Sequence, residues 1–410
     1  MLEVPNWGVG RRLLYLVNEP YFFYSHRLPI ARAAREHGFD VHIAAPDDHV
    51  WAPSDFDVDQ FDAEGFHFHA IPLNRRGLNP FEDLKTVAAL WRLLGELSPD
   101  LLHNVTIKPV LYGGILGRIR RTTGVVNAVP GLGHVFTSAD HRSRLLRLLI
   151  GRLYRVSLGN PRCRAIVQNP DDGDALLRIG AIGTRRLILI PGSGVSMAEF
   201  TPAPEVDGPP LVILPARLIW AKGIAEFVEA ARRLRRDGVA GRFALLGSAN
   251  TDFPGAVPEA QLRQWHDEGV VEWWGRRTDM PQVYRQAHVV CLPSNYGEGV
   301  PRALIEAAAV GRAIVTTDIP GCRDIVRHGE NGLLVATGDV DALAEALRRL
   351  LTDAAYRRQL GAKGRPIAEG EFTVESVVTQ TLDIYHELLA TERSGIVKSP
   401  ASASPSKDEK

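Results

Sequence analysis

The chain has 410 residues, which is too long for one compact core and suggests two domains, since a domain typically has roughly 150 residues. Its 48 Lys and Arg residues balance 48 Asp and Glu residues, so the overall charge does not indicate a nucleic-acid partner. Three widely spaced cysteines favour reduced thiols and argue against a disulfide framework or a cysteine-based metal site. No signal-peptide run or membrane-spanning stretch is present, so we expect a cytoplasmic protein that is at most peripheral on a membrane surface.

In the first half, short apolar runs rich in β-forming residues alternate with helical segments. Gly38 is a natural stop for the first long helix. Strands are expected at 11–17, 41–46, 66–73, 100–105 and 125–129, and helices at 26–38, 79–97 and 108–121. This alternation predicts an α/β domain over residues 11–190, with a parallel sheet covered by helices on both faces.

The segment at about 196–210 is rich in proline and lacks periodicity, so we interpret it as an interdomain linker. The alternation then restarts and predicts a second doubly wound domain within 191–371. An amphipathic helix is expected over 372–391, packing back towards the first domain, and residues 392–410 have the composition of a disordered tail. Two such domains facing each other leave a deep cleft at the carboxyl ends of their strands, where ligands of these sheets bind.

Two glutamates stand out in the stretch SNYGEGVPRALIEAAAVG, which reads as a loop followed by a helix. Glu298 lies just before the helix N-terminus, and Glu306 lies within the helix. The free backbone N–H groups at Gly299, Val300 and Arg302, together with the helix dipole, are suited to a phosphate. Carboxylates nearby can accept hydrogen bonds from sugar hydroxyls or from a vicinal diol such as a ribose. The alternative is that both acids are simply solvated.

The block YGEGVPRALIEAAAVGRAIVTTDIPGCRDIVRHGENGLLV resembles the donor-binding signature of family 4 glycosyltransferases, including the spacing of its two glutamates. The resemblance implies the GT-B fold, in which two Rossmann-like doubly wound domains face each other across a deep cleft. It implies that Glu298 positions the donor sugar and Glu306 the ribose. PARLIWAKGI looks like the segment in which the family carries an Arg and a Lys for the donor diphosphate, here Arg217 and Lys222. Without the glutamate block nearby, an Arg and a Lys such as Arg217 and Lys222 would more often be ordinary surface charges.

Other segments carry the resemblance more weakly. WWGRRTDMPQVYRQA looks like the loop with which family members hold the nucleotide base, which points to Gly275 and Arg276. Three N-terminal segments resemble a bacterial subgroup that extends polyprenyl-diphosphate-linked sugars, so the first domain would bind the acceptor. Candidate acceptor or sugar contacts there are His26, His103, Lys108, Gly131 and Gly133.

The N-terminal half also departs from the family pattern. Its first strand-to-helix turn lacks the usual pair of glycines, and PGLG occupies the place where many members carry a donor-facing histidine. His134 is a possible substitute for that histidine. His103 is expected at a strand end on the cleft side, where a structural hydrogen bond is as plausible as a sugar contact.

Signals for metals and other cofactors are poor. Asp-x-Asp pairs occur within SDFDVDQFDAEG, but this segment reads as a connector. His67 and His69 share one face of a strand and are better interpreted as a solvated stripe than as a zinc site. ALLGSAN is far from a dinucleotide-binding fingerprint. We therefore expect no metal and no bound cofactor, with a UDP-sugar as co-substrate.

A basic segment over 138–164 has leucines at helical spacing, and it includes Arg144, Arg147 and Arg152. It predicts either a helix that packs on the first sheet with its arginines in solvent, or a surface helix that attracts anionic lipid headgroups. The subgroup resemblance favours the second interpretation.

Taken together, the resemblance implies a metal-independent, retaining glycosyltransferase that moves a hexosamine-type sugar from a UDP-sugar to a lipid-diphosphate-linked glycan. Two alternatives remain open. One is a GT-B-type epimerase or hydrolase of nucleotide sugars, and the other is a non-catalytic protein that binds nucleotide sugars.

Overall fold

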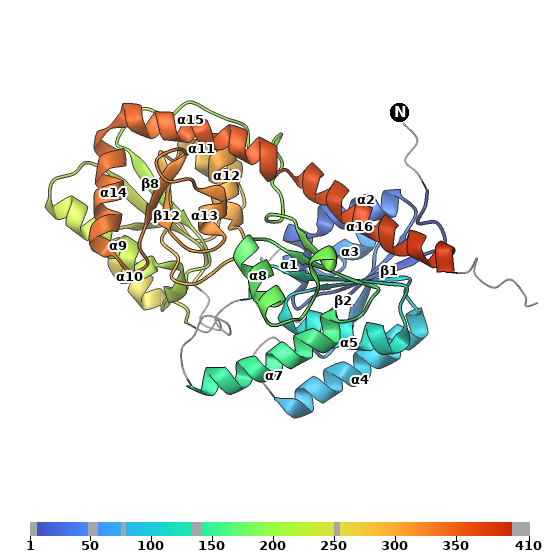
Figure 1. Cartoon of the computed structure of the whole chain (residues 1–410). Helices are drawn as coiled ribbons and strands as arrows, with labels where there is room; N and C mark the ends of the chain where they lie inside the picture. The colour runs from blue at the N-terminus through green and yellow to red at the C-terminus, as the bar shows by residue number, and fades with distance from the viewer. Residues whose placement is uncertain (1–5, 48–55, 75–78, 133–140, 250–254, 396–410) are drawn as a thin grey trace, which may run out of the picture.

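The computed structural model describes residues 6–47, 56–74, 79–132, 141–249 and 255–395, with only the backbone at 141–148 and 391–395. Two parallel sheets, each covered by helices, form two domains that lie side by side (Figure 1). The fold is therefore the two-domain α/β architecture that the alternating pattern predicts.

The first sheet has seven parallel strands in the order β3-β2-β1-β4-β5-β6-β7. Its central strands are buried on both faces, which explains why they are nearly continuous apolar runs. The strands are β1 Arg12–Leu16, β2 Asp40–Ala45, β3 His67–Ala70, β4 Leu101–Val105, β5 Gly124–Val129, β6 Cys163–Val167 and β7 Leu187–Leu189.

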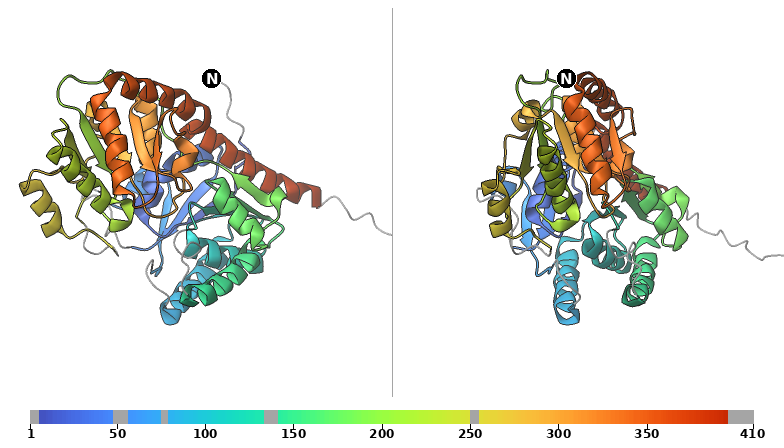
Figure 2. Two further views of the ribbon diagram at one scale, coloured as in Figure 1. Left: turned by 60° about the vertical axis from the view of Figure 1, so that its left-hand side comes forward. Right: turned by 90° about the vertical axis from the view of Figure 1, so that its left-hand side faces the viewer.

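Helices cover both faces of this sheet (Figure 1). On one face lie α1 Pro20–His26, α2 Leu28–Glu36 and α3 Gln60–Ala63. The other face is covered by α4 Pro80–Leu97, α5 Ile107–Arg120 and α7 His141–Leu158, and α8 Pro170–Arg178 follows β6. The turned views show α4, α5 and α7 together as an outer layer of the first domain (Figure 2).

The second sheet has six parallel strands in the order β10-β9-β8-β11-β12-β13. Its strands are β8 Leu211–Pro215, β9 Arg242–Leu246, β10 Glu272–Trp273, β11 Val289–Leu292, β12 Ala313–Thr317 and β13 Gly332–Val335. Its helices are α9 Ile224–Arg236, α10 Glu259–Asp267, α11 Met280–Gln286, α12 Arg302–Val310, α13 Cys322–Ile325, α14 Val340–Thr352 and α15 Ala354–Glu371.

The strand order of each sheet reverses once, between β1 and β4 in the first domain and between β8 and β11 in the second. At such a point the loops that follow two neighbouring strands run to opposite faces of the sheet and open a crevice between them. The loops after β8 and β11 belong to the second domain, and the loops after β1 and β4 belong to the first. These four loops are therefore where a ligand site is expected.

The last helix ties the two domains together. α16 Val374–Gly395 follows α15 directly and crosses back onto the first domain, where it packs against α2 and β5 (Figure 1). It runs to Gly395, past the predicted helix end at residue 391. None of the helices in the described part of the chain has the length and apolarity that crossing a bilayer requires.

Tyr385 anchors α16 in the first domain. Its ring is fully buried, and its hydroxyl hydrogen-bonds with the Tyr15 hydroxyl at 3.0 Å and with His103 Nδ1 at 2.5 Å. A long-range contact of this kind joins the C-terminal helix to two central strands, β1 and β4.

We expect Tyr385→Ala to lower the free energy of unfolding by about 3–5 kcal/mol, because it opens a cavity of aromatic size. Tyr385→Phe should cost only about 1–2 kcal/mol, since it removes the hydrogen bonds and keeps the packing. Urea denaturation measures both, and Thr379→Ala on the exposed face of α16 is the matched control. Equal losses for the two Tyr385 variants would show that the hydrogen bonds, and not packing, hold the helix.

Candidate active site

Two loops of the second domain meet at its strand-order reversal. Gly223 lies between β8 and α9 at φ +73°, and a Cβ there would approach the Pro293 carbonyl oxygen to 1.9 Å. The backbone N–H of Asn295 donates to the Ala221 carbonyl at 2.8 Å. A glycine is therefore required at 223, because it lets the loop after β8 pack directly on the loop after β11.

The packed loops bring a lysine and a glutamate into contact. Lys222 is only 7% exposed, and its Nζ forms a close ion pair with Glu298 Oε2. The other carboxylate oxygen of Glu298 accepts a hydrogen bond from the Ser294 hydroxyl. Burial is the largest influence and by itself would lower the pKa of Lys222, but Glu298 and Tyr296 together outweigh it and hold this pKa above its usual value. The lysine therefore stays a fixed cation.

The backbone after Glu298 lies against the first domain. A Cβ on Gly299 would come within 2.2 Å of the Pro130 carbonyl oxygen and 2.0 Å of Gln168 Oε1. Gly131 approaches the Gly299 nitrogen, and Asn169 Nδ2 donates to the Glu298 carbonyl at 3.0 Å. Glu298 and Gly299 therefore lie at the interdomain contact, where both domains can reach a bound ligand.

Glu306 lies on the buried side of α12, the helix that follows this loop. Its Oε1 accepts a hydrogen bond of 2.8 Å from Arg302 Nε, one turn earlier. Burial raises the pKa of the Glu306 carboxyl, and the Arg302 guanidinium opposes that shift. Arg302 also donates to the Ser25 carbonyl of the first domain at 2.5 Å. Glu306 is therefore not the solvated acid of the alternative interpretation.

His26 faces the cationic side of the site from the first domain. Its ring stacks on Phe22 at 4.4 Å, and its Nδ1 hydrogen-bonds with the Ser25 hydroxyl. Burial, followed by the positive charges of Arg302, Arg27 and Arg217, lowers the pKa of His26 to about 3. The imidazole is therefore neutral near pH 7. Arg217 itself is exposed in the loop after β8.

The loop after β10 reaches the first domain at a separate point. The Arg276 guanidinium lies 4.9 Å from the centre of the Tyr21 ring on α1. Gly275 has φ +65°, and no atom lies within 4 Å of the position that a Cβ would occupy. The loop therefore leaves open space beside Gly275 that a planar group can enter.

Comparisons with known proteins agree with this geometry. Residues 12–159 match the family described as Glycosyl transferase 4-like, and residues 209–353 match Glycosyl transferases group 1. The two matches fall on the first and the second domain.

The chain is a glycosyltransferase.

Relatives of similar length support this assignment and the resemblance to family 4. The chain is 25% identical over 362 residues to the N,N'-diacetylbacillosaminyl-diphospho-undecaprenol alpha-1,3-N-acetylgalactosaminyltransferase of Campylobacter jejuni, covering 85% of this chain and 92% of that protein. It is 22% identical over 333 residues to the UDP-Gal:alpha-D-GlcNAc-diphosphoundecaprenol alpha-1,3-galactosyltransferase of Escherichia coli, covering 78% and 84%.

The structural comparison confirms the GT-B fold. Sucrose-phosphate synthase from Thermosynechococcus elongatus superposes with a TM-score of 0.74 at 23% identity, covering 93% of this chain and 100% of that one. Anabaena HepE in complex with UDP and glucose superposes with a TM-score of 0.69 at 18% identity, covering 91% and 99%.

Two residues predicted as acceptor contacts, His103 and Lys108, bind other residues of the protein. His103 lies in the middle of β4, not at its end, and is buried between Tyr15 and Tyr385. The expected position on the cleft side is therefore wrong, and the structural alternative describes His103 better. Lys108 Nζ pairs with Asp83 Oδ1 at 2.8 Å and donates to the Asn74 carbonyl at 2.8 Å, so it joins α5 to α4.

Several other predicted positions are only partly described. Gly133 and His134 lie outside the described residues, and the side chains of Arg144 and Arg147 on α7 are not described. Arg152 is exposed on that helix, and Val300 is buried, so only its backbone can serve a ligand.

The histidines considered as metal ligands bind other side chains. His69 hydrogen-bonds with His42, and His67 pairs with Asp40. Among the described residues, no group of His, Cys, Asp or Glu has the arrangement of a metal site.

Sequence reasoning missed the residues that support the glutamate. Ser294 binds Glu298 directly, and Asn295 Nδ2 donates to Glu226 Oε1 at 2.7 Å, which pins the loop to α9. Their position beside the motif was an available signal. Gln168 and Asn169 reach the same loop from the first domain, and no local pattern marks them.

The Lys222–Glu298 pair should be strongly coupled in stability. Lys222→Ala leaves a buried carboxylate without its cation and should cost about 3 kcal/mol while the protein still folds. Adding Glu298→Gln to that variant should restore at least about 1 kcal/mol, since the amide carries no charge. Urea denaturation of the wild type, both single variants and the double variant measures this coupling. Strictly additive losses would show that the two side chains act independently.

Proposed function

We propose that this glycosyltransferase transfers an N-acetylhexosamine from a UDP-sugar to a polyprenyl-diphosphate-linked glycan, with retention at the anomeric carbon. The observation that carries the proposal is the buried Lys222–Glu298 pair beside the N-terminus of α12, at the contact between the domains. Both relatives are named for transfer to undecaprenol-diphosphate-linked sugars, which supports the acceptor class, and the UDP-Gal donor in the name of one of them supports the nucleotide.

The cationic groups would bind the donor diphosphate. Arg217 and Lys222 supply fixed positive charge, and Gly299 and Val300 directly precede the N-terminus of α12, where backbone amides and the helix dipole favour an anion. Because Lys222 is a cation with a raised pKa, it can exchange its contact with Glu298 for a phosphate oxygen without losing its proton. Glu298 would then be free to accept hydrogen bonds from the hydroxyls of the donor sugar.

The leaving group would take part in the reaction. In a front-face attack, the acceptor hydroxyl approaches the anomeric carbon from the side on which the diphosphate departs. The bond from that carbon to the diphosphate oxygen breaks, the new glycosidic bond forms, and the diphosphate accepts the proton of the hydroxyl. Fixed cations that stabilise the departing charge lower the barrier of this step. No base from the protein is needed.

Other residues would set the positions of the substrates. Glu306 would hold the ribose diol, with Arg302 keeping its carboxylate oriented. The space beside Gly275, with Arg276, would take the base. From the first domain, neutral His26 faces the cationic side of the site and the backbone at Gly131 lies beside Gly299, so both would contact the acceptor or the sugar. We propose that the reaction needs neither a metal nor another cofactor.

A donor screen against a lipid-linked acceptor tests the proposal and its two alternatives. Release of UDP that depends on the acceptor, with a matching mass increase of the acceptor, supports transfer. Turnover without an acceptor would support an epimerase or hydrolase, and binding without turnover would support a non-catalytic protein. Either of the last two results would contradict the proposed transfer.

Substitutions of the two glutamates should change different kinetic constants. Glu298→Gln should lower kcat about a hundredfold, since losing one contact made in the transition state costs about 3 kcal/mol. Glu306→Ala should raise the KM for the donor more than it lowers kcat, because ribose contacts are equal in the ground and transition states. Steady-state kinetics with varied donor concentration measure both. Near-normal turnover in Glu298→Gln would contradict its assigned role.

Activity should persist in excess EDTA, because cationic side chains of the protein would stabilise the negative charge of the departing diphosphate in place of a metal ion. Initial rates with EDTA, and with added Mg²⁺ or Mn²⁺, measure this. A strict requirement for a divalent ion would contradict the proposal. Moderate stimulation would not, since divalent ions also screen free diphosphate.

We propose that α7 helps the enzyme to bind an anionic membrane surface. Binding to phospholipid vesicles should rise with the anionic fraction and fall with salt. Changing Arg144, Arg147 and Arg152 together to glutamate should abolish most of it, because each arginine near the surface contributes about 1 kcal/mol. Cosedimentation measures binding, and salt-insensitive binding that survives the triple change would contradict the role of α7.

A further inference from the structure

Helix α4 has two apolar faces, and only one of them packs on the sheet. The inner face, with Leu90, Leu93 and Leu94, belongs to the buried core of the first domain. The outer face carries Phe81, Leu84, Ala88 and Trp91, which follow each other at spacings of three, four and three residues and so form one stripe. Phe81 is 79% exposed, Leu84 67% and Trp91 41%. An ordinary surface helix would be polar here.

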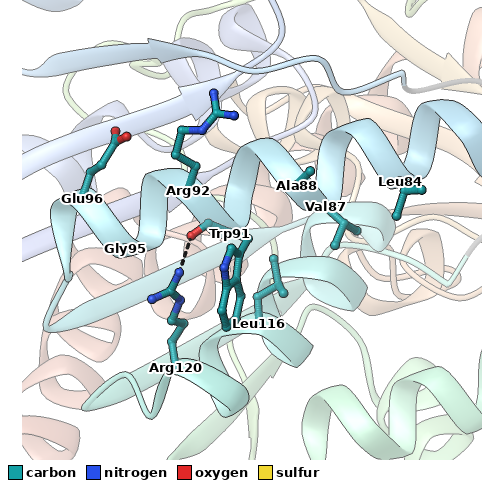
Figure 3. Close-up of a pocket in the computed structure, with 9 residues that line it drawn as sticks. All are labelled: Leu84, Val87, Ala88, Trp91, Arg92, Gly95, Glu96, Leu116 and Arg120. Carbon is teal, nitrogen blue, oxygen red and sulfur yellow. Dashed lines mark hydrogen bonds between the residues drawn. The ribbon is translucent and has the colours of Figure 1, made fainter.

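The stripe borders an open groove of about 610 Å³ between α4 and α5 (Figure 3). Val87 and Leu116 form apolar parts of its lining. The Arg120 guanidinium lies 3.6 Å from the centre of the Trp91 ring and donates to the Trp91 carbonyl at 2.9 Å. Gly95 makes this possible, since a Cβ there would lie 3.0 Å from Arg120 Nη2. The indole is thus held in place with a cation beside it.

The cations beside the stripe gather around Trp91. Lys85 and Arg92 are exposed on α4, and Arg120 flanks Trp91 from α5. The acids are Glu82 and Asp83 in the first turn of α4, where Asp83 pairs with Lys108, and Glu96 in the groove. An apolar stripe with an aromatic residue and flanking cations is the pattern of helices that lie in the headgroup region of a bilayer.

The other two helices of this outer layer also carry exposed apolar side chains. α5 packs against both α4 and α7, and the three helices form one side of that domain (Figure 2). Ile119 on α5, and Leu149 and Val156 on α7, are further large apolar side chains exposed on these helices. Arg152 is exposed on α7 as well. One layer therefore carries both apolar and cationic groups.

We propose that the outer stripe of α4 inserts into the interfacial region of a bilayer containing anionic lipid, with Trp91 at the depth of the headgroups. This inference rests on the proposed function, because a polyprenyl-diphosphate acceptor is held in a membrane. A second copy of the chain is the alternative occupant of this face. The stripe supplies binding that salt does not screen, whereas the arginines of α7 supply binding that salt weakens.

The test uses the full-length protein and phosphatidylcholine vesicles containing phosphatidylglycerol, some of them with bromine on the acyl chains to quench nearby indoles. Brominated vesicles should quench the fluorescence of the wild type, and Trp91→Phe should lose that part of the quenching. The double variant Phe81→Ser, Leu84→Ser should bind vesicles about tenfold or more weakly at high salt, because each apolar side chain adds to partitioning. Val206→Ser, which changes an exposed apolar residue of the second domain, is the matched control.

Equal quenching in the wild type and in Trp91→Phe, or unchanged binding by the double variant, would overturn the inference. So would a dimer in sedimentation that the double variant converts to a monomer, since a second copy would then cover the stripe. Transfer to a short-chain, water-soluble acceptor separates the two proposals, because it should be equal in the wild type and the double variant. If the enzyme transfers sugar but brominated vesicles do not quench Trp91, only the role of α4 is contradicted. If the vesicles quench Trp91 but no sugar is transferred, the result contradicts the proposed function.

Discussion

The buried ion pair between Lys222 and Glu298 is the contact on which the site depends. Its two members come from loops after neighbouring strands, β8 and β11, so it can form only where the strand order of the second sheet reverses. Burial would otherwise favour a neutral lysine, and the glutamate prevents this. The pair therefore places a cation and a carboxylate side by side, and in the proposed reaction a diphosphate and a sugar would take over their contacts.

Close approach of backbones determines how the two domains share this site. The loop after β11 lies against Gly131 and Pro130 of the first domain on one side, and against Gly321 of its own domain on the other. Side chains at these glycines would separate the layers, so the contact depends on their absence. Arg302 adds a hydrogen bond to the first domain from the start of α12, and α16 fixes the opposite side of the molecule through Tyr385. The site is thus built between two anchored domains.

Two histidines of the first domain show that the residues around a side chain determine which contacts it can make. His103 and His26 are both predicted as acceptor or sugar contacts from segments in the first half of the chain. The first is enclosed by two tyrosines beneath α16, whereas the second stacks on Phe22 and faces arginines of the second domain. Burial lowers the pKa of both. His26 therefore lies at the contact between the domains, whereas His103 lies inside the first domain.

The sequence by itself determined the alternating α/β pattern, the glycine stops and the two glutamates at a helix start, because these follow from local periodicity and from motifs short enough to read in one segment. It also predicted Arg217 and Lys222 through the family resemblance. The tertiary structure alone decided that Lys222 pairs with Glu298, 76 positions away, that Asn169 and Gln168 reach the same loop, and that His103 is enclosed. Those contacts join residues distant in the chain, and the packing of sheets and helices, which no local pattern encodes, sets which of them meet.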